Sequence, residues 1–163
     1  MPFRATAAIA LAATRASACS MMGETPAATA PAAKHAYAGV YGGSYVCTDG
    51  EHGFYLDIAT VIPKDGGGFD ASGVLGLFPT LAGASGPVGG VAGSFNVSGT
   101  ISSDGTVAMT AGDWLKQPTG YGAADLEGRL RQKSDGSYAL TGKPVVRGNP
   151  SACSNLIATQ FLP

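Results

Sequence analysis

The chain has 163 residues, of which 45% are hydrophobic and 13% are charged. A chain of this length forms one domain, and its hydrophobic content argues against a wholly disordered protein. It carries 10 basic and 11 acidic residues, with an isoelectric point near 6.0. This balance excludes the broad positive field on which non-specific nucleic-acid binding depends, so we expect no nucleic-acid partner.

The first 18 residues have the layout of a secretory signal peptide. Arg4 precedes the small, apolar run Ala5–Ala13, and Ala16-Ser17-Ala18 stands directly before Cys19. Arg15 interrupts the apolar part, so an alanine-rich disordered leader is the alternative interpretation. Elsewhere the chain has no stretch that approaches the roughly 18 unbroken apolar residues of a membrane-spanning helix. We therefore expect an exported protein.

Residues 11–19, which end in Ala-Ser-Ala-Cys, resemble the lipobox of bacterial lipoproteins. The resemblance implies that Cys19 is lipidated and that this anchor is the protein's contact with the membrane. Ordinary signal cleavage, which leaves Cys19 as a free thiol, stays open. Residues 19–36 are rich in Ala, Pro and Thr, and we interpret them as a flexible tether to a domain that spans residues 37–163. The expected location is the bacterial cell envelope, lipid-anchored or periplasmic, or otherwise outside the cell.

Cys47 and Cys153 stand near the two ends of the domain. In an exported chain such a pair becomes a disulfide, which here would fasten the first strand to the last. A redox or metal site is the rival interpretation. The sequence, however, has no Cys-x-x-Cys motif and no histidine at zinc-finger spacing from either thiol. We predict a structural disulfide, no metal site and no cofactor.

Apolar and polar residues alternate along most of the domain, which predicts β-strands, and no segment has helical periodicity. The expected strands are Gly42–Thr48, Phe54–Ile62, Phe69–Phe78, Phe95–Ile101, Thr106–Met109, Ala124–Leu130, Ser137–Leu140 and Leu156–Leu162. Asp-Gly pairs between them favour the positive φ angles of hairpin turns. These pairs are Asp49-Gly50, Asp65-Gly66, Asp104-Gly105 and Asp135-Gly136. The sequence predicts an all-β antiparallel meander of about eight strands.

Closing the sheet would remove its exposed edges, so a small closed barrel of the lipocalin-like kind is favoured over a sandwich. At this size the interior is either filled by side chains or has room for one small ligand. The sequence leaves both interiors open. The glycine-rich segment 83–93 runs into a strand rather than a helix, and we interpret it as a flexible loop over one end of the barrel.

His52 is the only histidine that follows the leader and the tether. A Ser-His-Asp or Cys-His device would therefore need His52, with Asp49, Glu51 or Asp57 as its orienting acid. The polar segment 47–53 predicts a hairpin turn with Glu51 and His52 in solvent at its tip. The sequence has no Gly-x-Ser-x-Gly motif. We expect no enzyme.

The segment Gly112–Tyr121 combines the only tryptophan with a cation, a proline and a tyrosine, in a stretch between two expected strands. Amphipathic aromatic side chains in such a loop anchor partners. We select Trp114, Lys116, Pro118 and Tyr121 as candidate binding residues. The alternative is a tryptophan that belongs to the core, with Tyr121 packed beside it.

Several segments together resemble a domain common in exported bacterial proteins. They are Gly43-Ser44-Tyr45-Val46-Cys47, Gly53-Phe54-Tyr55-Leu56-Asp57-Ile58, Gly93-Ser94-Phe95, Trp114-Leu115-Lys116-Gln117-Pro118-Thr119-Gly120-Tyr121, Asp125-Leu126-Glu127-Gly128 and Cys153. The resemblance covers most of the chain after Gly39 and implies an exported, disulfide-bonded β module with no assigned reaction. The Asp-Gly-Glu-His turn after Cys47 departs from the family pattern, which more often has Gln-Gly there.

The early Tyr-x-Cys and the late Cys also resemble membrane-bound lysozyme inhibitors of the C-type, which are small lipoprotein barrels. Their inhibitory Ser-Gly-Ala-x-Tyr loop is missing, and only Ala71-Ser72-Gly73 stands here. We expect a non-catalytic binding module tethered in the envelope, with an unknown protein or a small apolar molecule as its ligand. Inhibition of a lysozyme-like or other hydrolase is the first alternative. A hydrolase that uses His52 is the second.

Overall fold

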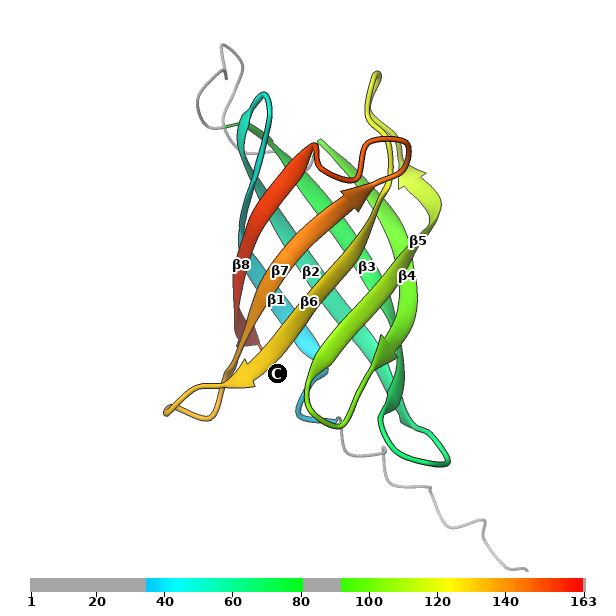
Figure 1. Cartoon of the computed structure of the whole chain (residues 1–163), viewed down its shortest axis with the longest axis vertical. Coiled ribbons are helices and arrows are strands. Elements are labelled where there is room, and N and C mark those ends of the chain that lie inside the picture. The colour runs from blue at the N-terminus through cyan, green and yellow to red at the C-terminus, as the bar shows by residue number, and fades with distance from the viewer. Residues whose placement is uncertain (1–34, 81–91, 163) are drawn as a thin grey trace, which may run out of the picture. The chain divides into compact units, whose positions relative to one another are not determined.

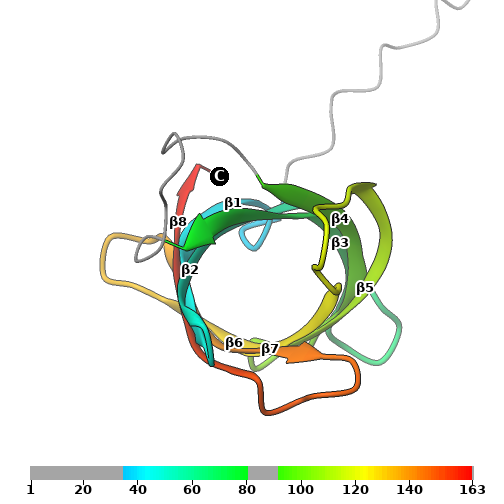
Figure 2. The same ribbon diagram turned by 90° about the horizontal axis from the view of Figure 1, so that it is seen from above.

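The computed structural model describes residues 35–80 and 92–162. In these two ranges the chain forms eight antiparallel strands and no helix, as the sequence predicts. They are β1 (Gly39–Cys47), β2 (Gly50–Pro63), β3 (Phe69–Thr80), β4 (Gly93–Ile101), β5 (Thr106–Lys116), β6 (Ala124–Gln132), β7 (Tyr138–Val146) and β8 (Cys153–Leu162). Each strand pairs with the next, and β8 pairs with β1, so the sheet closes into the predicted barrel (Figure 1, Figure 2). None of the described segments is a helix that could cross a membrane.

Some predictions concern residues beyond these ranges. The signal peptide, Cys19 and the tether up to residue 34 lie outside the described residues, as does the glycine-rich loop up to residue 91. They stay predictions.

The alternation of side chains explains why these segments form a barrel. Along β2, Phe54, Leu56 and Ile58 are at most 2% exposed and face the interior. Tyr55 and Asp57 between them face outward, because successive side chains of a strand point to opposite faces. The same period of two recurs in β4 and β5. The interior of the barrel is therefore apolar.

The glycines of all four Asp-Gly pairs adopt positive φ angles, which confirms the predicted turns. Gly50, Gly66, Gly105 and Gly136 have φ values of 129°, 87°, 86° and 86°. Gly50 is the first residue of β2, and the other three stand between β2 and β3, β4 and β5, and β6 and β7. Glycine is favoured at these positions because a Cβ atom would strain the backbone there.

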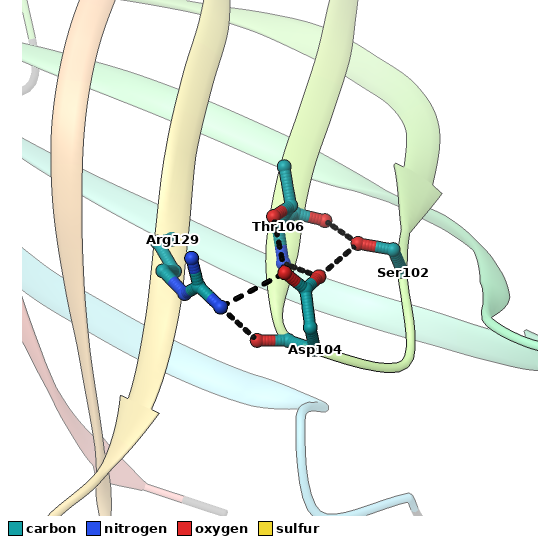
Figure 3. A network of polar contacts seen from close by, with 4 residues as sticks. All are labelled: Ser102, Asp104, Thr106 and Arg129. Atoms are coloured by element: carbon teal, nitrogen blue, oxygen red, sulfur yellow. Dashed lines mark hydrogen bonds and ion pairs between the residues drawn. The ribbon is translucent and has the colours of Figure 1, made fainter.

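The β4–β5 turn is held by the Asp104 carboxylate (Figure 3). This carboxylate accepts hydrogen bonds from the Ser102 hydroxyl at 2.6 Å and from the Thr106 backbone N–H at 3.1 Å. Arg129 of β6 donates to it at 2.8 Å, which ties the turn to the neighbouring strand. These hydrogen bonds, that of Ser102 foremost, lower the pKa of Asp104 to about 2. Asp104 is therefore ionised at neutral pH, and it fixes the start of β5.

β5 is longer than the sequence predicts. The expected strand ends at Met109, whereas β5 continues to Lys116 because its second half pairs with β4, where Trp114 lies opposite Phe95. The register shifts just before this pair, so residues 112–113 form a bulge that interrupts the alternation. The segment predicted as a loop is therefore partly strand, and the connection to β6 starts only after Lys116.

The end at which the chain enters the barrel is closed. Gln160 is 7% exposed, and its side-chain amide donates to the backbone oxygens of Ala36 at 3.1 Å and Ala38 at 2.9 Å. The Tyr41 hydroxyl donates to the backbone oxygen of Tyr37 at 2.9 Å. Four rings pack together at this end, those of His35, Tyr37, Phe69 and Tyr138. Two residues that the sequence assigned to the tether, 35 and 36, thus contact the barrel.

The opposite end carries the β1–β2, β5–β6 and β7–β8 connections (Figure 1). The predicted disulfide is confirmed here. Cys47, the last residue of β1, is bonded to Cys153, the first residue of β8, across a sequence separation of 106 residues. The bond fastens the first strand to the last at the end of the barrel opposite the N-terminal turn, which residues 35–38 form.

Candidate functional site

The open half of the barrel contains a cavity of about 420 Å³. Its floor consists of apolar side chains, namely Phe54, Leu75, Leu77, Phe95, Leu126 and Leu156. Its rim consists of residues from the β1–β2, β5–β6 and β7–β8 connections, which are the ones described at this end, namely Thr48, Asp49, Gly120, Tyr121, Gly122 and Ala152. None of the described residues that line it belongs to the closed end, so the cavity is blind.

Small residues leave this space unfilled. Ala124 and Ala152 line the cavity, and Gly120 and Gly122 add no side chain to it. In the closed half, the inward positions carry larger side chains that are at most 3% exposed, among them Ile101, Met109, Leu130 and Leu140. The sequence leaves open whether side chains fill the interior. In the structure one half of the interior is filled and the other is hollow.

His52 lies in the wall of this cavity, and the prediction that it is solvated at a turn is wrong. β2 starts at Gly50, so His52 is a strand residue that faces inward like Phe54, and it is only 4% exposed. Its ring stacks on Tyr45 with a centroid distance of 5.3 Å and an interplanar angle of 12°. Glu51 is exposed, as predicted. The period of two that turns Phe54 inward was the signal for His52, and the turn interpretation missed it.

The hydrogen bonds of His52 define its orientation. Nε2 lies 2.9 Å from the Asp49 carboxylate, and because a carboxylate only accepts, Nε2 is the donor. Nδ1 is buried and has no hydrogen-bond partner in the part of the chain that the structure describes. A hydrolase of the kind considered above would need a hydroxyl or thiol at that nitrogen. The His52–Asp49 pair therefore supplies an imidazole and its orienting acid, but among the described residues no hydroxyl or thiol is hydrogen-bonded to Nδ1.

Cys47, Asp49 and His52 place one ligand atom each within 4.8 Å of one another, a spacing at which such groups can hold a metal ion. The Cys47 sulfur is in the disulfide and is not a thiolate ligand. The Asp49 carboxylate and the His52 imidazole are hydrogen-bonded to each other. The hydrogen bond from His52 is the main cause that lowers the pKa of Asp49, which is therefore a carboxylate at neutral pH. Its side chain is 70% exposed at the rim.

Tyr45 forms the wall between His52 and Phe54, with ring centroids 5.3 Å and 5.9 Å from theirs. It is 8% exposed. Burial, followed by the charges of Tyr121 and Asp49, raises the pKa of Tyr45 to about 12. Tyr45 is therefore a neutral phenol at physiological pH.

A second polar group lies where β5 and β6 separate. Their backbone ladder ends at Met109 opposite Leu126. Beyond it, the Ala111 N–H donates to the Asp125 carboxylate at 2.8 Å, and the Arg147 guanidinium donates to the Ala111 carbonyl at 2.9 Å. Arg147 also pairs with Asp125 at 3.2 Å. Asp125 thus lines the cavity, and its hydrogen bonds replace backbone pairing between β5 and β6. Sequence patterns could not indicate this role, because it depends on the point at which the two strands separate.

The four predicted binding residues all lie at the open end, and Tyr121 among them lines the cavity. Trp114 is half-buried, and its ring packs edge-on against Phe95 with a centroid distance of 4.9 Å. Since Phe95 belongs to the floor and Trp114 lies opposite it in the strand pairing, Trp114 packs against the floor without lining the cavity itself. Lys116 is exposed, and Pro118 is half-buried in the β5–β6 connection, which follows the edge of the opening (Figure 2).

Comparison of the chain with known protein-family models finds no match, and comparison with curated proteins finds none either. The resemblances drawn from the sequence therefore stay predictions. The candidate site rests on its own geometry, a blind apolar cavity whose wall carries two carboxylates, two phenols and one buried imidazole.

Proposed function

We propose that the protein is a non-catalytic binding barrel that holds one small, largely apolar molecule in the cavity at its open end. The observation that carries this proposal is the blind cavity of about 420 Å³ with its apolar floor. Ligand sites in proteins have volumes of roughly 300–1,000 Å³ and are lined mainly by apolar and aromatic side chains with a few polar groups. This cavity has that size and that composition.

The catalytic alternative has less support. His52 and Asp49 form the imidazole and carboxylate of a hydrolase device, but no described hydroxyl or thiol is bonded to His52 Nδ1. A hydrolase that depends on His52 would lose its activity in His52→Ala. The binding proposal expects that variant to keep the apolar floor and to bind ligand still.

A fluorescence titration with N-phenyl-1-naphthylamine tests the binding proposal. This neutral probe fluoresces on leaving water, and the only tryptophan of the chain, Trp114, packs on a floor residue and can transfer energy to it. We expect saturable binding with one probe per protein. Ala124→Phe places a ring in the cavity and should weaken this binding by about tenfold or more.

Ala108→Phe is the matched control. It introduces the same ring on the exposed outer face of β5 and should leave probe binding unchanged. If Ala124→Phe binds the probe as tightly as the parent protein, or if the parent does not bind it, the cavity is not the ligand site.

We further propose that the protein is exported and anchored in the bacterial envelope through Cys19. The order of basic, apolar and small residues before Cys19 supports export, and the Cys47–Cys153 disulfide supports an oxidising compartment. Cys19→Ser should move the protein from the membrane fraction to the soluble fraction of its host. Continued sedimentation of Cys19→Ser with membranes would exclude the lipid anchor.

Inhibition of a lysozyme-like hydrolase is the second candidate function. The observation that favours a protein partner is Leu115, which is 58% exposed between Trp114 and Lys116 at the open end. A C-type lysozyme assayed with and without the barrel provides the test. Loss of lysozyme activity that Leu115→Ser restores would favour inhibition, and unchanged activity would remove it.

A further inference from the structure

The charged groups that line the cavity have one sign. Among the described lining residues the ionisable acids are Asp49 and Asp125, and no lysine or arginine lines the cavity. Asp125 is paired with Arg147, so its charge is balanced. Asp49 is hydrogen-bonded to the imidazole of His52 instead, and within the described ranges it forms no ion pair with a lysine or arginine. The rim therefore carries a carboxylate that is open to a cation from the cavity side.

Aromatic rings line the same space. Phe54 and Phe95 belong to the floor, and Tyr45 and Tyr121 stand above them toward the rim. The face of an aromatic ring is negative and attracts an ammonium group that comes within about 6 Å of its centre. Rings and carboxylate thus favour the same charge on a ligand.

The field of the whole barrel has the same sign. The described residues include 10 acidic and 7 basic side chains, a net charge of −3. A cationic ligand is attracted to such a protein at long range, and an anionic one is repelled.

We propose that the cavity binds a cationic amphiphile, a small molecule with an apolar body and one ammonium group. The body rests on the floor of Phe54, Leu77 and Phe95, and the ammonium group pairs with Asp49 at the rim. This inference rests on the proposed function, because it names the chemical class of molecule that the same cavity takes.

Three probes of one shape and different charge provide the test. They are 1-naphthylmethylamine, 1-naphthalenemethanol and 1-naphthoic acid, which at pH 7 are a cation, a neutral molecule and an anion. Dissociation constants are measured by calorimetry on the whole barrel at low salt. We expect the amine to bind about tenfold more tightly than the alcohol, and the acid to bind most weakly. Added salt should reduce the advantage of the amine, because the rim is open to solvent.

Asp49→Asn removes the charge and keeps an oxygen that accepts the hydrogen bond of His52. We expect it to reduce the advantage of the amine over the alcohol to about twofold or less. Asp113→Asn is the matched control, because it makes the same change of charge at an exposed position of the same end that does not line the cavity. It should keep the full advantage of the amine.

The outcomes separate this inference from the proposed function. If the alcohol and the acid bind as tightly as the amine, the inference is overturned and the binding barrel stands. The same holds if Asp113→Asn removes the advantage as fully as Asp49→Asn does. If none of the three probes binds, the binding barrel fails and the inference fails with it. If Asp49→Asn folds poorly, the salt dependence of the parent protein is the test instead. An advantage of the amine over the alcohol that added salt does not reduce would overturn the inference.

Discussion

At the scale of single residues, Trp114 connects the barrel wall to the floor of the cavity. Its ring contacts Phe95 edge-on at 4.9 Å, while part of it stays exposed. We expect Trp114→Ala to lower the free energy of unfolding by about 2 kcal/mol, less than the ~3–5 kcal/mol of a fully buried tryptophan. Urea denaturation followed by circular dichroism measures this change.

Leu115→Ala is the control for that measurement, because Leu115 is the exposed neighbour on the same strand. Its effect should stay within about 0.5 kcal/mol. A Trp114→Ala protein as stable as the parent would show that the ring contributes nothing to the fold, and would return Trp114 to the role of an exposed anchor.

Tyr45 makes the stability of the barrel sensitive to alkaline pH. Its pKa is raised from 10.0 to about 12 by burial, so the folded state holds its proton more tightly than the unfolded state. The corresponding stability is complete below pH 10 and is lost as the pH rises from 10 to 12. Between pH 9 and pH 11 the parent should lose about 1.4 kcal/mol more than Tyr45→Phe, measured from urea midpoints. Equal losses in the two proteins would mean that Tyr45 ionises as freely as in the unfolded chain.

The candidate site was only partly predictable from single residues. The pairing of Cys47 with Cys153 followed from their number and position, and Tyr121 was selected because an amphipathic ring stood in a connection. The polar neighbours of His52 and the adjacent Asp-Gly pair predict a solvated turn residue, although the spacing of His52 from Phe54 indicates the inward face. The role of Asp125 could not be predicted, because it depends on the point at which the neighbouring strands β5 and β6 separate.

At the scale of elements, side chains maintain the junction of β5 and β6 at the open end. Asp125 accepts from the Ala111 N–H at 2.8 Å, beyond the last backbone pair. We expect Asp125→Ala to speed the hydrogen exchange of the Ala111 amide by about tenfold and to lower the free energy of unfolding by ~1–3 kcal/mol, because a half-buried donor loses its acceptor. Nuclear magnetic resonance measures the exchange of each amide.

The Thr106 amide is the internal reference for that experiment. It bonds to Asp104 at the other end of β5, so its exchange should not change. Equal acceleration of both amides would indicate a general loss of stability instead of a local opening. An unchanged Ala111 amide would show that the backbone holds this junction without Asp125.

The elements themselves followed well from the sequence where two signals agreed. Alternation together with an Asp-Gly pair located the turns of four hairpins. The second half of β5 was missed because the bulge at residues 112–113 breaks the alternation, and only the ladder with β4 extends the strand. β7 likewise continues past Leu140, since its last residues are held by pairing with β6.

At the scale of the whole molecule, the disulfide closes the barrel where the N-terminal turn cannot. It links residues that are 106 positions apart. The chain-entropy model gives a loop of this length up to ~4–5 kcal/mol of stabilisation. We expect the double variant Cys47→Ser and Cys153→Ser to lose stability of this order in urea denaturation. A loss below about 1 kcal/mol would mean that strand pairing alone defines the closed state.

The closed barrel could be predicted because strand number, turn spacing and the terminal cysteines all agreed with it. The cavity could not. Whether the interior is filled depends on which side chains meet across the barrel. The sequence does not show that Ala124, Ala152, Gly120 and Gly122 line the same cavity. Periodicity indicates the face on which a residue lies. The volume of a cavity depends on which side chains face one another inside the folded barrel.

The most direct test of the binding proposal is a methyl spectrum of the barrel titrated with N-phenyl-1-naphthylamine. Leu77, Leu126 and Leu156 line the cavity, whereas Leu130 and Leu140 are buried in the filled half. We predict saturable shifts of the first three residues and unchanged signals from the other two. Shifts confined to Leu130 and Leu140, or a spectrum that the probe does not change, would contradict a ligand site at the open end.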